Sequence, residues 1–462
     1  MKKITLPFAA KKSSNHYTIA LLKPSDIAAW KKTQPKDTLA LMKSIGFQGN
    51  VGQTFIDGNT VTIGVDKTVK RYDVAQGLQT VKDFFTAETL STATFAFKGD
   101  SLSKDDMTHA AIGWGYFWYR FDAYKKIEAA PKLVMPKQAD KTRVEAILTS
   151  VYTLKTLINM PANDCTPDLL EKTARGMAKD FQGTLSVTKD ANLEKEFPLV
   201  HMVGKASANK PRLLDLQWGN SKHPALTIVG KGVTFDTGGL NIKPGSYMAL
   251  MRKDMGGSAH ALALGRLVMA LGLKVRLRVI VPAVENAISS NAFRPSDIMK
   301  SRKGLTVENL DTDAEGRLIL ADALAYACEG SPELLIDFAT LTGSARAALG
   351  PDIPAAFATK DKTGQALQDM AFENDDPVWR MPFWDGYKKH LKSDSADIAN
   401  HASIPGDLMY SALFLKHFVD DKTDWVHLDC MAWELSGRPG RPKGAADTGL
   451  LAALALVESR FN

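Results

Sequence analysis

The chain has 462 residues, of which 45% are hydrophobic and 24% are charged, and this composition excludes disordered and fibrous proteins. Its three cysteines form no CxxC pair and no disulfide framework, which is typical of a reducing compartment. The apolar stretch near the N-terminus is too short for a signal peptide, and no long apolar run predicts a membrane span. We therefore expect a cytoplasmic protein without membrane association.

The net charge of +7 arises at the N-terminus. Residues 1–50 hold nine lysines and two aspartates, whereas residues 51–462 hold 49 basic and 49 acidic side chains. We interpret the excess as a solvated lysine-rich face, and the alternative is a weak binding site for an anionic partner such as nucleic acid.

The first part of the chain mixes strand-like and helix-like segments, which predicts a small α/β domain. The expected strands lie at 16–22, 52–64 and 92–98. The expected helices lie at 38–45, 75–88, 105–127 and about 140–158. Two prolines among polar residues at 131–141 indicate a domain boundary. We therefore expect three parts, which are an N-terminal α/β domain (1–135), a linking helix (136–160) and a larger C-terminal domain (161–462).

Further along, strands and helices alternate. The expected strands lie at 213–218, 225–230, 275–284, 334–341 and 425–430. The expected helices lie at 258–271, with Ser258 as N-cap, at 318–328 and at 448–458. Such alternation predicts a mostly parallel sheet flanked by helices, with functional residues at the carboxyl ends of its strands.

Several common motifs are absent from the sequence. It contains no GxGxxG after a strand, no GxxxxGK[ST], no HExxH and no GxSxG. Dinucleotide binding, P-loop chemistry and a serine nucleophile elbow therefore lose support.

Four carboxylates stand out in two glycine-rich segments, 229–257 and 311–318: Asp236, Asp254, Asp313 and Glu315. Asp313 and Glu315 are two residues apart, so in an extended segment both side chains would project to one face. Four carboxylates brought together would repel one another and take up protons unless positive charge lies among them. A pair of divalent cations is the simplest source, and hard oxygen ligands leave Zn, Mn, Mg and Co open. The alternative is that both segments are ordinary turns.

Three basic residues accompany the carboxylates. Beside two cations and away from water the pKa of Lys231 would fall, so that its neutral amine could bind a metal. Lys243 could instead remain protonated and stabilise a developing oxyanion. Arg317, at a predicted helix start, presents a guanidinium suited to a small oxyanion or a carboxylate.

These segments resemble the leucyl aminopeptidase (cytosol aminopeptidase) family of M17 metallopeptidases. DTDAEGRL at 311–318 differs at one position from the signature NTDAEGRL, and GKGVTFDTGGLNIKP (230–244) and MRKDMGG (251–257) are almost unaltered. INMPANDCTP (158–167) and FATLTGSARAALG (338–350) also match. The resemblance covers roughly residues 150–460, and the N-terminal part matches only in position and α/β character.

The resemblance implies two divalent metal ions per subunit, Zn or Mn, with five ligands: Lys231, Asp236, Asp254, Asp313 and Glu315. Asp236 and Glu315 would bridge the two ions. Lys243 would polarise the scissile carbonyl, and Arg317 would hold a bicarbonate ion as general base. The implied function is release of N-terminal amino acids from peptides with a free amine, by attack of a metal-bridging water on the scissile amide, in a homohexamer.

The resemblance also implies a pocket for the first substrate side chain, lined by Met251, Thr340, Gly343 and Asp311. Asp311 stands where the family has asparagine, so its charge either favours polar or basic first residues or turns to solvent. The segment KGAADTG (443–449) departs from the family pattern as well, and we transfer no pocket residues from it.

Two other functions remain open at this point. The first is a peptidase-like protein that acts mainly as a nucleic-acid-binding or scaffold module through its basic N-terminal region. The second is a dinuclear hydrolase of phosphoesters, but the lack of histidines near the motifs and the lysine expected as a ligand favour a peptide amide.

Overall fold

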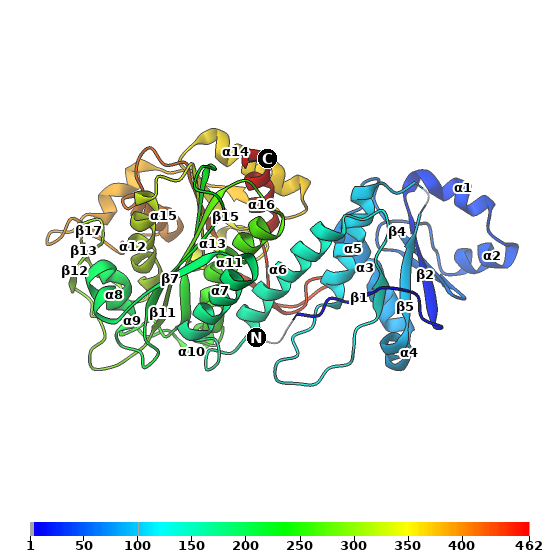
Figure 1. The fold of residues 1–462 in the computed structure, drawn as a ribbon, viewed down its shortest axis with the longest axis horizontal. Coiled ribbons are helices and arrows are strands. Elements are labelled where there is room, and N and C mark those ends of the chain that lie inside the picture. Colours follow the sequence, from blue (N-terminus) through cyan, green and yellow to red (C-terminus); the bar gives the residue numbers. More distant parts are fainter. Residues whose placement is uncertain (1–3, 100, 462) are drawn as a thin grey trace. The chain divides into compact units, whose positions relative to one another are not determined.

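The computed structural model describes residues 4–99 and 101–461 and divides into two compact units (Figure 1). One unit comprises Met1–Tyr152 with Ser436–Lys443, and the other comprises Thr153–Leu435 with Gly444–Asn462. The division falls within helix α6 (Lys141–Asn159), which confirms the helix expected over about 140–158. We keep the expected three-part division, 1–135, 136–160 and 161–462, as a proposal.

The N-terminal unit is built on a six-stranded sheet in the order β1-β6-β5-β2-β4-β3. Only the β3–β4 pair is antiparallel among the pairings described. The strands are β1 (Phe8–Ala9), β2 (His16–Leu22), β3 (Thr54–Asp57), β4 (Thr60–Gly64), β5 (Thr94–Lys98) and β6 (Lys132–Val134). The helices are α1 (Ile27–Lys32), α2 (Lys36–Ser44), α3 (Arg71–Phe84), α4 (Ala87–Thr92) and α5 (Lys104–Trp118), with a 3₁₀ turn at Pro24–Asp26.

Three expectations in this unit were wrong in detail. The single helix expected at 75–88 is two helices, α3 and α4, separated by Phe85 and Thr86. The single strand expected at 52–64 is the β3–β4 hairpin, which turns at Gly58 with a positive φ of 54°. The helix expected to reach residue 127 ends at Trp118, because Tyr119 adopts extended backbone angles. Arg120 Nη1 then donates to the carbonyl oxygens of Phe117 and Tyr119, both at 2.8 Å, and so satisfies acceptors at the helix end.

The larger unit contains a nine-stranded sheet with a parallel centre. The path runs β16-β15-β18-β14-β9-β11-β8-β7, and β10 also pairs with β11. The central pairings are parallel, and antiparallel pairings occur toward both edges. The strands are β7 (Thr184–Lys189), β8 (Arg212–Trp218), β9 (Ala225–Gly230), β10 (Gly232–Asp236), β11 (Arg276–Asn286), β14 (Leu334–Ala339), β15 (Ala355–Ala358), β16 (Trp379–Arg380) and β18 (Trp425–Asp429). The expected mostly parallel sheet with flanking helices is confirmed.

Helices cover both faces of this sheet and form a three-layer α/β arrangement (Figure 1). One layer contains α7 (Pro167–Phe181), α11 (Gly256–Ala270) and α16 (Leu450–Phe461). The opposite layer contains α9 (Pro198–Gly204), α12 (Glu315–Glu329) and α15 (Asp407–Lys416). The remaining helices are α8 (Asp190–Glu196), α10 (Gly245–Met248), α13 (Gly343–Leu349) and α14 (Asp361–Glu373), with 3₁₀ helices η2 (Met251–Met255) and η3 (Asp385–Leu391).

The remaining strands form two small sheets. They are β12 (Ile298–Lys300), β13 (Thr306–Glu308) and β17 (Ile398–Ala399) in one, and β19 (Trp433–Glu434) and β20 (Gly444–Ala445) in the other. Among the residues that the structure describes, none of the helices combines the length and the apolar character that crossing a bilayer requires.

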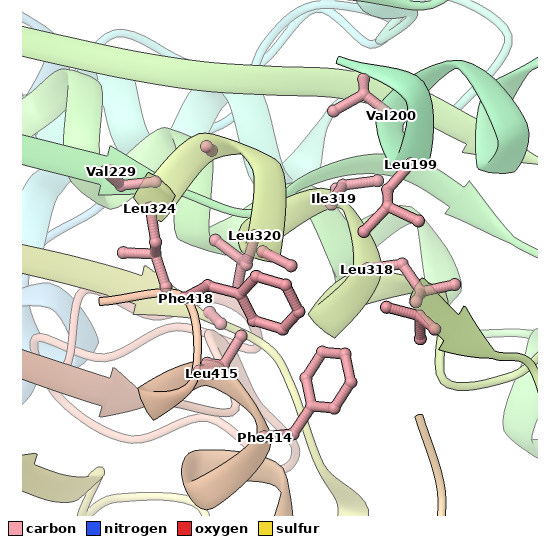
Figure 2. Close-up of a cluster of buried hydrophobic side chains, with 14 of the residues drawn as sticks. Leu199, Val200, Val229, Leu318, Ile319, Leu320, Leu324, Phe414, Leu415 and Phe418 are labelled. Atoms are coloured by element: carbon pink, nitrogen blue, oxygen red, sulfur yellow. The ribbon is translucent and has the colours of Figure 1, made fainter. Parts of the chain in front are cut away.

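Helix α12 is anchored in the hydrophobic core (Figure 2). Its side chains Leu318, Leu320 and Leu324 pack among residues of α9, β9 and α15, including Phe414 of α15. Nearly every residue of α12 is buried, which explains its alanine- and leucine-rich sequence without a polar stripe. This anchoring fixes the N-terminal turn of α12, where two of the predicted site residues lie.

Candidate active site

The predicted site residues meet at the carboxyl ends of neighbouring parallel strands. Lys231 follows β9, Asp236 is the last residue of β10, and Thr340 follows β14. Asp236 was expected in a loop after the 225–230 strand, but the short strand β10 continues the chain to it beside β11. This position is the one that open parallel sheets use for their ligands.

Asp236 is held in place by the strand beside it. Its Oδ1 accepts hydrogen bonds of 2.8 Å from the side-chain amide of Asn286 and from the backbone N–H of Gly238. Gly238 has a φ of 85°, and a Cβ there would lie 2.4 Å from the carbonyl oxygen of Asn241. Only glycine therefore allows this turn without a clash.

Asp313 and Glu315 converge through a turn, and the extended segment expected for them was wrong. Asp313 lies in the turn before α12, whereas Glu315 is the first residue of that helix. The turn is joined to the Asp236 loop because Thr312 Oγ1 donates to the carbonyl oxygen of Gly238 at 2.6 Å. Carboxylate oxygens of three residues lie within 4.8 Å of one another: Asp236, Asp313 and Glu315.

Helix α11 also begins differently from the expectation. It starts at Gly256, with Met255 as N-cap, so that Ser258 lies inside the first turn. Ser258 Oγ donates to the carbonyl oxygen of Met255 at 2.7 Å and caps no backbone N–H. The preceding 3₁₀ helix η2 brings Asp254 to the site, where its Oδ1 accepts a hydrogen bond of 2.9 Å from Thr340 Oγ1.

Two lysines lie among the carboxylates. Lys231 Nζ is 2.7 Å from Asp254 Oδ2 and 3.1 Å from Glu315 Oε1. Lys243 Nζ is 2.8 Å from Asp236 Oδ2 and also contacts Asp313. The two ammonium groups thus join the motif segments into one buried cluster.

The burial of this cluster shifts the protonation of its members. Burial, followed by repulsion from Asp236, raises the pKa of Asp313 and of Glu315. Burial lowers the pKa of Lys231 and of Lys243, but the surrounding carboxylates raise both by more.

The residues fit a divalent cation. Three carboxylates offer oxygen atoms to one place, and Glu315 Oε2 is buried without a hydrogen-bond partner. Carboxylates whose pKa is raised by mutual repulsion gain most when a cation neutralises them. Oxygen donors of this kind suit Mg, Mn or Zn, and a lysine amine favours the more nitrogen-tolerant Zn and Mn.

The four expected pocket residues differ in how they are related to this cluster. Thr340 contacts Asp254 directly, Met251 begins η2, and Gly343 begins α13 with open space where a Cβ would lie. Asp311 Oδ1 accepts the backbone N–H of Asp313 at 2.9 Å, so this residue shapes the turn. Its Oδ2 lies 3.9 Å from Nδ1 of His401.

Arg317 is the third residue of α12, and chain atoms bind it on two nitrogens. Nη1 donates to the carbonyl oxygen of Asn400 at 2.7 Å, and Nη2 donates to Asp407 Oδ1 at 2.8 Å. Nε is buried without a hydrogen-bond partner. Neither Asn400 nor Asp407 lies in a motif, and sequence analysis missed both.

Two further residues that shape the site were also missed. Asn286 binds Asp236 from the end of β11, and only the strand register reveals that contact. Thr312 lies between Asp311 and Asp313 in the 311–318 motif. Its position between two predicted site residues was a signal that it contributes to the site as well. A buried carboxylate cluster at the carboxyl ends of parallel strands is characteristic of metal-dependent hydrolases with an α/β fold.

Comparison with known proteins agrees with the assignment to the metal-dependent hydrolases. Residues 152–454 match the model of the cytosol aminopeptidase family catalytic domain, and residues 17–136 match that of the M17 aminopeptidase N-terminal domain. The chain therefore belongs to the cytosol aminopeptidase (M17) family, and the resemblance found in the sequence is confirmed. Its enzyme class is aminopeptidase.

Relatives and solved structures agree with this assignment. The chain is 36% identical over 418 residues to Peptidase B of Pectobacterium carotovorum, an alignment covering 87% of this chain and 90% of the relative. It is similar to the crystal structure of a cytosol aminopeptidase from Coxiella burnetii, with 40% identity, a TM-score of 0.91 and coverage of 98% and 99%. It is also similar to the bottromycin maturation enzyme BotP in complex with Mn, with 25% identity, a TM-score of 0.86 and coverage of 97% and 100%.

Proposed function

We propose that this protein is a dinuclear metallo-aminopeptidase, which releases N-terminal amino acids from peptides by attack of a metal-bridging water on the scissile amide. One observation carries the proposal: Asp236, Asp313 and Glu315 direct oxygen atoms to one place, and two lysines complete the buried cluster. Family membership supplies the peptide substrate with a free amine.

Five residues would hold two divalent ions: Lys231, Asp236, Asp254, Asp313 and Glu315. Asp236 and Glu315 would bridge the ions, and Lys231 and Asp254, which are paired at 2.7 Å, would complete one of the two sites. We propose Zn or Mn as the metal, and the manganese complex of BotP supports Mn. When bound, such ions would lower the pKa of a bridging water and polarise the scissile carbonyl.

Lys243 is the side chain that would stabilise the oxyanion. Its Nζ lies between Asp236 and Asp313, and the acidic neighbours raise its pKa, so it keeps its proton. A half-buried ammonium held in this way needs little rearrangement when negative charge develops on the substrate oxygen. Lys243 is therefore assigned the electrophilic role, whereas the ligand role of Lys231 is proposed from the family resemblance.

We propose that the first substrate side chain lies against Met251, Thr340, Gly343 and Asp311. Asp311 is partly exposed, and one of its oxygens is not used by the turn. That oxygen lies 3.9 Å from Nδ1 of His401, and the negative charge of Asp311 supports the acceptance of polar or basic first residues.

The assembly and the location are also proposed from the family. We expect a homohexamer in the cytoplasm, in keeping with the name of the cytosol aminopeptidases. Large apolar side chains are exposed on the loops beside the site and on the short helix α10, which supports contacts between subunits there. They are Leu240 (44% exposed), Ile242 (60%), Tyr247 (58%) and Leu310 (40%).

The test is to remove bridging ligands. Asp236→Ala and Glu315→Ala should each abolish metal binding, measured by elemental analysis, together with turnover of aminoacyl amides. Glu373→Ala, on the exposed side of α14, is the matched control and should retain both properties. Full turnover in either site variant would disprove the assignment, and turnover of a phosphoester instead of an amide would favour the other class of dinuclear hydrolase.

Nucleic-acid binding is the alternative function, and the lysines of the first fifty residues motivate it. Several of them lie on α1 and α2, including Lys32, Lys36 and Lys43, which are exposed. Binding through these groups should weaken steeply with added salt. An absence of DNA binding at low salt would remove this alternative.

A further inference from the structure

The guanidinium of Arg317 is already paired with an anion that belongs to the chain. Nη2 donates to Asp407 Oδ1 at 2.8 Å, and Nη1 donates to the carbonyl oxygen of Asn400 at 2.7 Å. Only 4% of the Arg317 side chain is exposed, so its charge is neutralised by these contacts rather than by solvent. The bicarbonate implied by the family resemblance would need the same guanidinium.

Asp407 is built to remain ionised in this place. It is the first residue of α15, where the positive end of the helix dipole favours a carboxylate. Ser411, one turn later, donates its hydroxyl to the same Oδ1 at 2.9 Å. Burial raises the pKa of Asp407, but Arg317 and Ser411 lower it by more, so the net pKa is lowered.

A bicarbonate ion does not fit beside this pair. It would have to displace the Asp407 carboxylate or lie next to a like charge, because both terminal nitrogens of Arg317 already donate to chain atoms and only Nε has no partner. A second anion would therefore share the guanidinium with two chain acceptors while being repelled by Asp407 at close range. The residues around Arg317 disagree with the cofactor that the resemblance implies.

Arg317 also connects this pair to the metal-binding turn. Asn400, whose carbonyl oxygen accepts from Arg317, binds the segment before Asp313 through its own side chain. Its Oδ1 accepts the backbone N–H of Leu310 at 2.8 Å, and its Nδ2 donates to the carbonyl oxygen of Asp311 at 2.8 Å. The orientation of Arg317 is therefore coupled to the position of that turn.

We propose that Asp407 is a positioning residue that takes the place of bicarbonate as the counter-anion of Arg317, so that this enzyme works without added bicarbonate. The inference rests on the proposed aminopeptidase function. Asp407 is the first residue of α15, and none of the sequence motifs includes it.

The first measurement uses the unaltered protein loaded with Mn. Turnover of an aminoacyl amide is compared in buffer depleted of carbon dioxide and in the same buffer with added sodium bicarbonate, with sodium chloride at equal ionic strength as control. Equal rates are expected. A several-fold stimulation by bicarbonate would overturn the inference, whereas an absence of turnover in both buffers would count against the proposed function itself.

The second measurement removes the carboxylate. Asp407→Gly should lose at least about tenfold in turnover without bicarbonate, in the range typical of lost support around a metal site, and should recover activity as bicarbonate is added. Asp407→Asn keeps the size of the side chain and should recover less. Asp385→Gly, on the exposed start of η3, is the control and should behave like the unaltered protein.

A binding measurement separates this inference from catalysis. In metal-free protein, bicarbonate should raise the melting temperature of Asp407→Gly, because a ligand that binds only the folded state stabilises it, and should leave that of the unaltered protein unchanged. Stabilisation of both proteins, or of neither, would overturn the proposal even if no activity were found.

Discussion

Asn286 donates a hydrogen bond of 2.8 Å from its side-chain amide to Oδ1 of Asp236, and the two residues are register partners at the ends of β11 and β10. The same amide nitrogen lies 3.1 Å from the carbonyl oxygen of Thr312. Asn286 is fully buried. It therefore ties a carboxylate of one motif to the backbone of the other, although it belongs to neither.

Replacement of Asn286 by alanine should weaken metal binding. Without the amide, Asp236 and the turn at Thr312 lose their shared donor, and loss of such outer contacts typically costs about 10–100-fold in metal affinity or activity. Titration of Mn into metal-free protein, followed by calorimetry, measures the change. Asn220→Ala, in the exposed turn after β8, is the matched control, and an equal affinity in both variants would exclude the proposed support.

Replacement of Lys243 by methionine should lower the rate by about 10²–10³, the usual cost of removing one oxyanion donor. The effect should appear mainly in kcat, since the ammonium acts on charge that develops in the transition state. Lys243→Arg retains the charge and should be less damaged. Lys222→Met, on an exposed turn, is the control. A change confined to KM would instead indicate that Lys243 only binds substrate.

The sequence predicts the sheet and the two motif segments because apolar periodicity and paired glycines mark them directly. The start of α12 was not predictable in the same way. Its N-cap is Ala314, whose side chain makes no capping hydrogen bond, so none of the usual start signals separates Asp313 in the turn from Glu315 in the helix. The anchored core beneath α12, rather than local sequence, decides where the helix begins.

Supporting residues that are far from the motifs in the sequence could not be predicted, for another reason. Asn286, Asn400 and Asp407 act through strand register and through loops that return to the site. Their separation in sequence from Asp236 and Arg317 leaves no spacing pattern to detect. Motif analysis therefore recovers the groups that are clustered along the chain and misses those that only folding brings together.

Metal binding should weaken in acid. Burial and then repulsion from Asp236 raise the pKa of Asp313 and Glu315 above the ordinary range for carboxyl groups, so in the metal-free protein they hold protons to higher pH. A metal must displace those protons, so the apparent affinity should fall between about pH 8 and pH 5.

Calorimetry in two buffers of different ionisation enthalpy measures the protons released on binding. Glu315→Gln, which unlike Glu315→Ala keeps an oxygen donor at this position, should release fewer protons than the unaltered protein at the same pH. An affinity that stays constant from pH 8 to pH 5, with no proton release, would contradict the raised pKa values.

Asp106 should stabilise the N-terminal unit at neutral pH and lose that effect in strong acid. Burial alone would raise its pKa, but the Lys23 ammonium at 2.7 Å and hydrogen bonds from the backbone N–H groups of Val69 and Ser103 lower it to about 2. A carboxyl group whose pKa is lower in the folded state than in the unfolded state contributes stability above the unfolded value, near 3.8, and this contribution disappears as the pH falls toward about 2.

Asp106→Asn should therefore reduce the free energy of unfolding of this unit by about 1–3 kcal/mol at pH 7, the usual cost of disrupting hydrogen bonds to a buried charged group. The difference between the variant and the unaltered protein should shrink as the pH is lowered from 5 to about 2.5. Hydrogen exchange of amides in α5 reports on this unit alone. Asp105→Asn changes the adjacent exposed carboxylate and is the control, and a pH-independent loss in Asp106→Asn would show that shape, not charge, matters at this position.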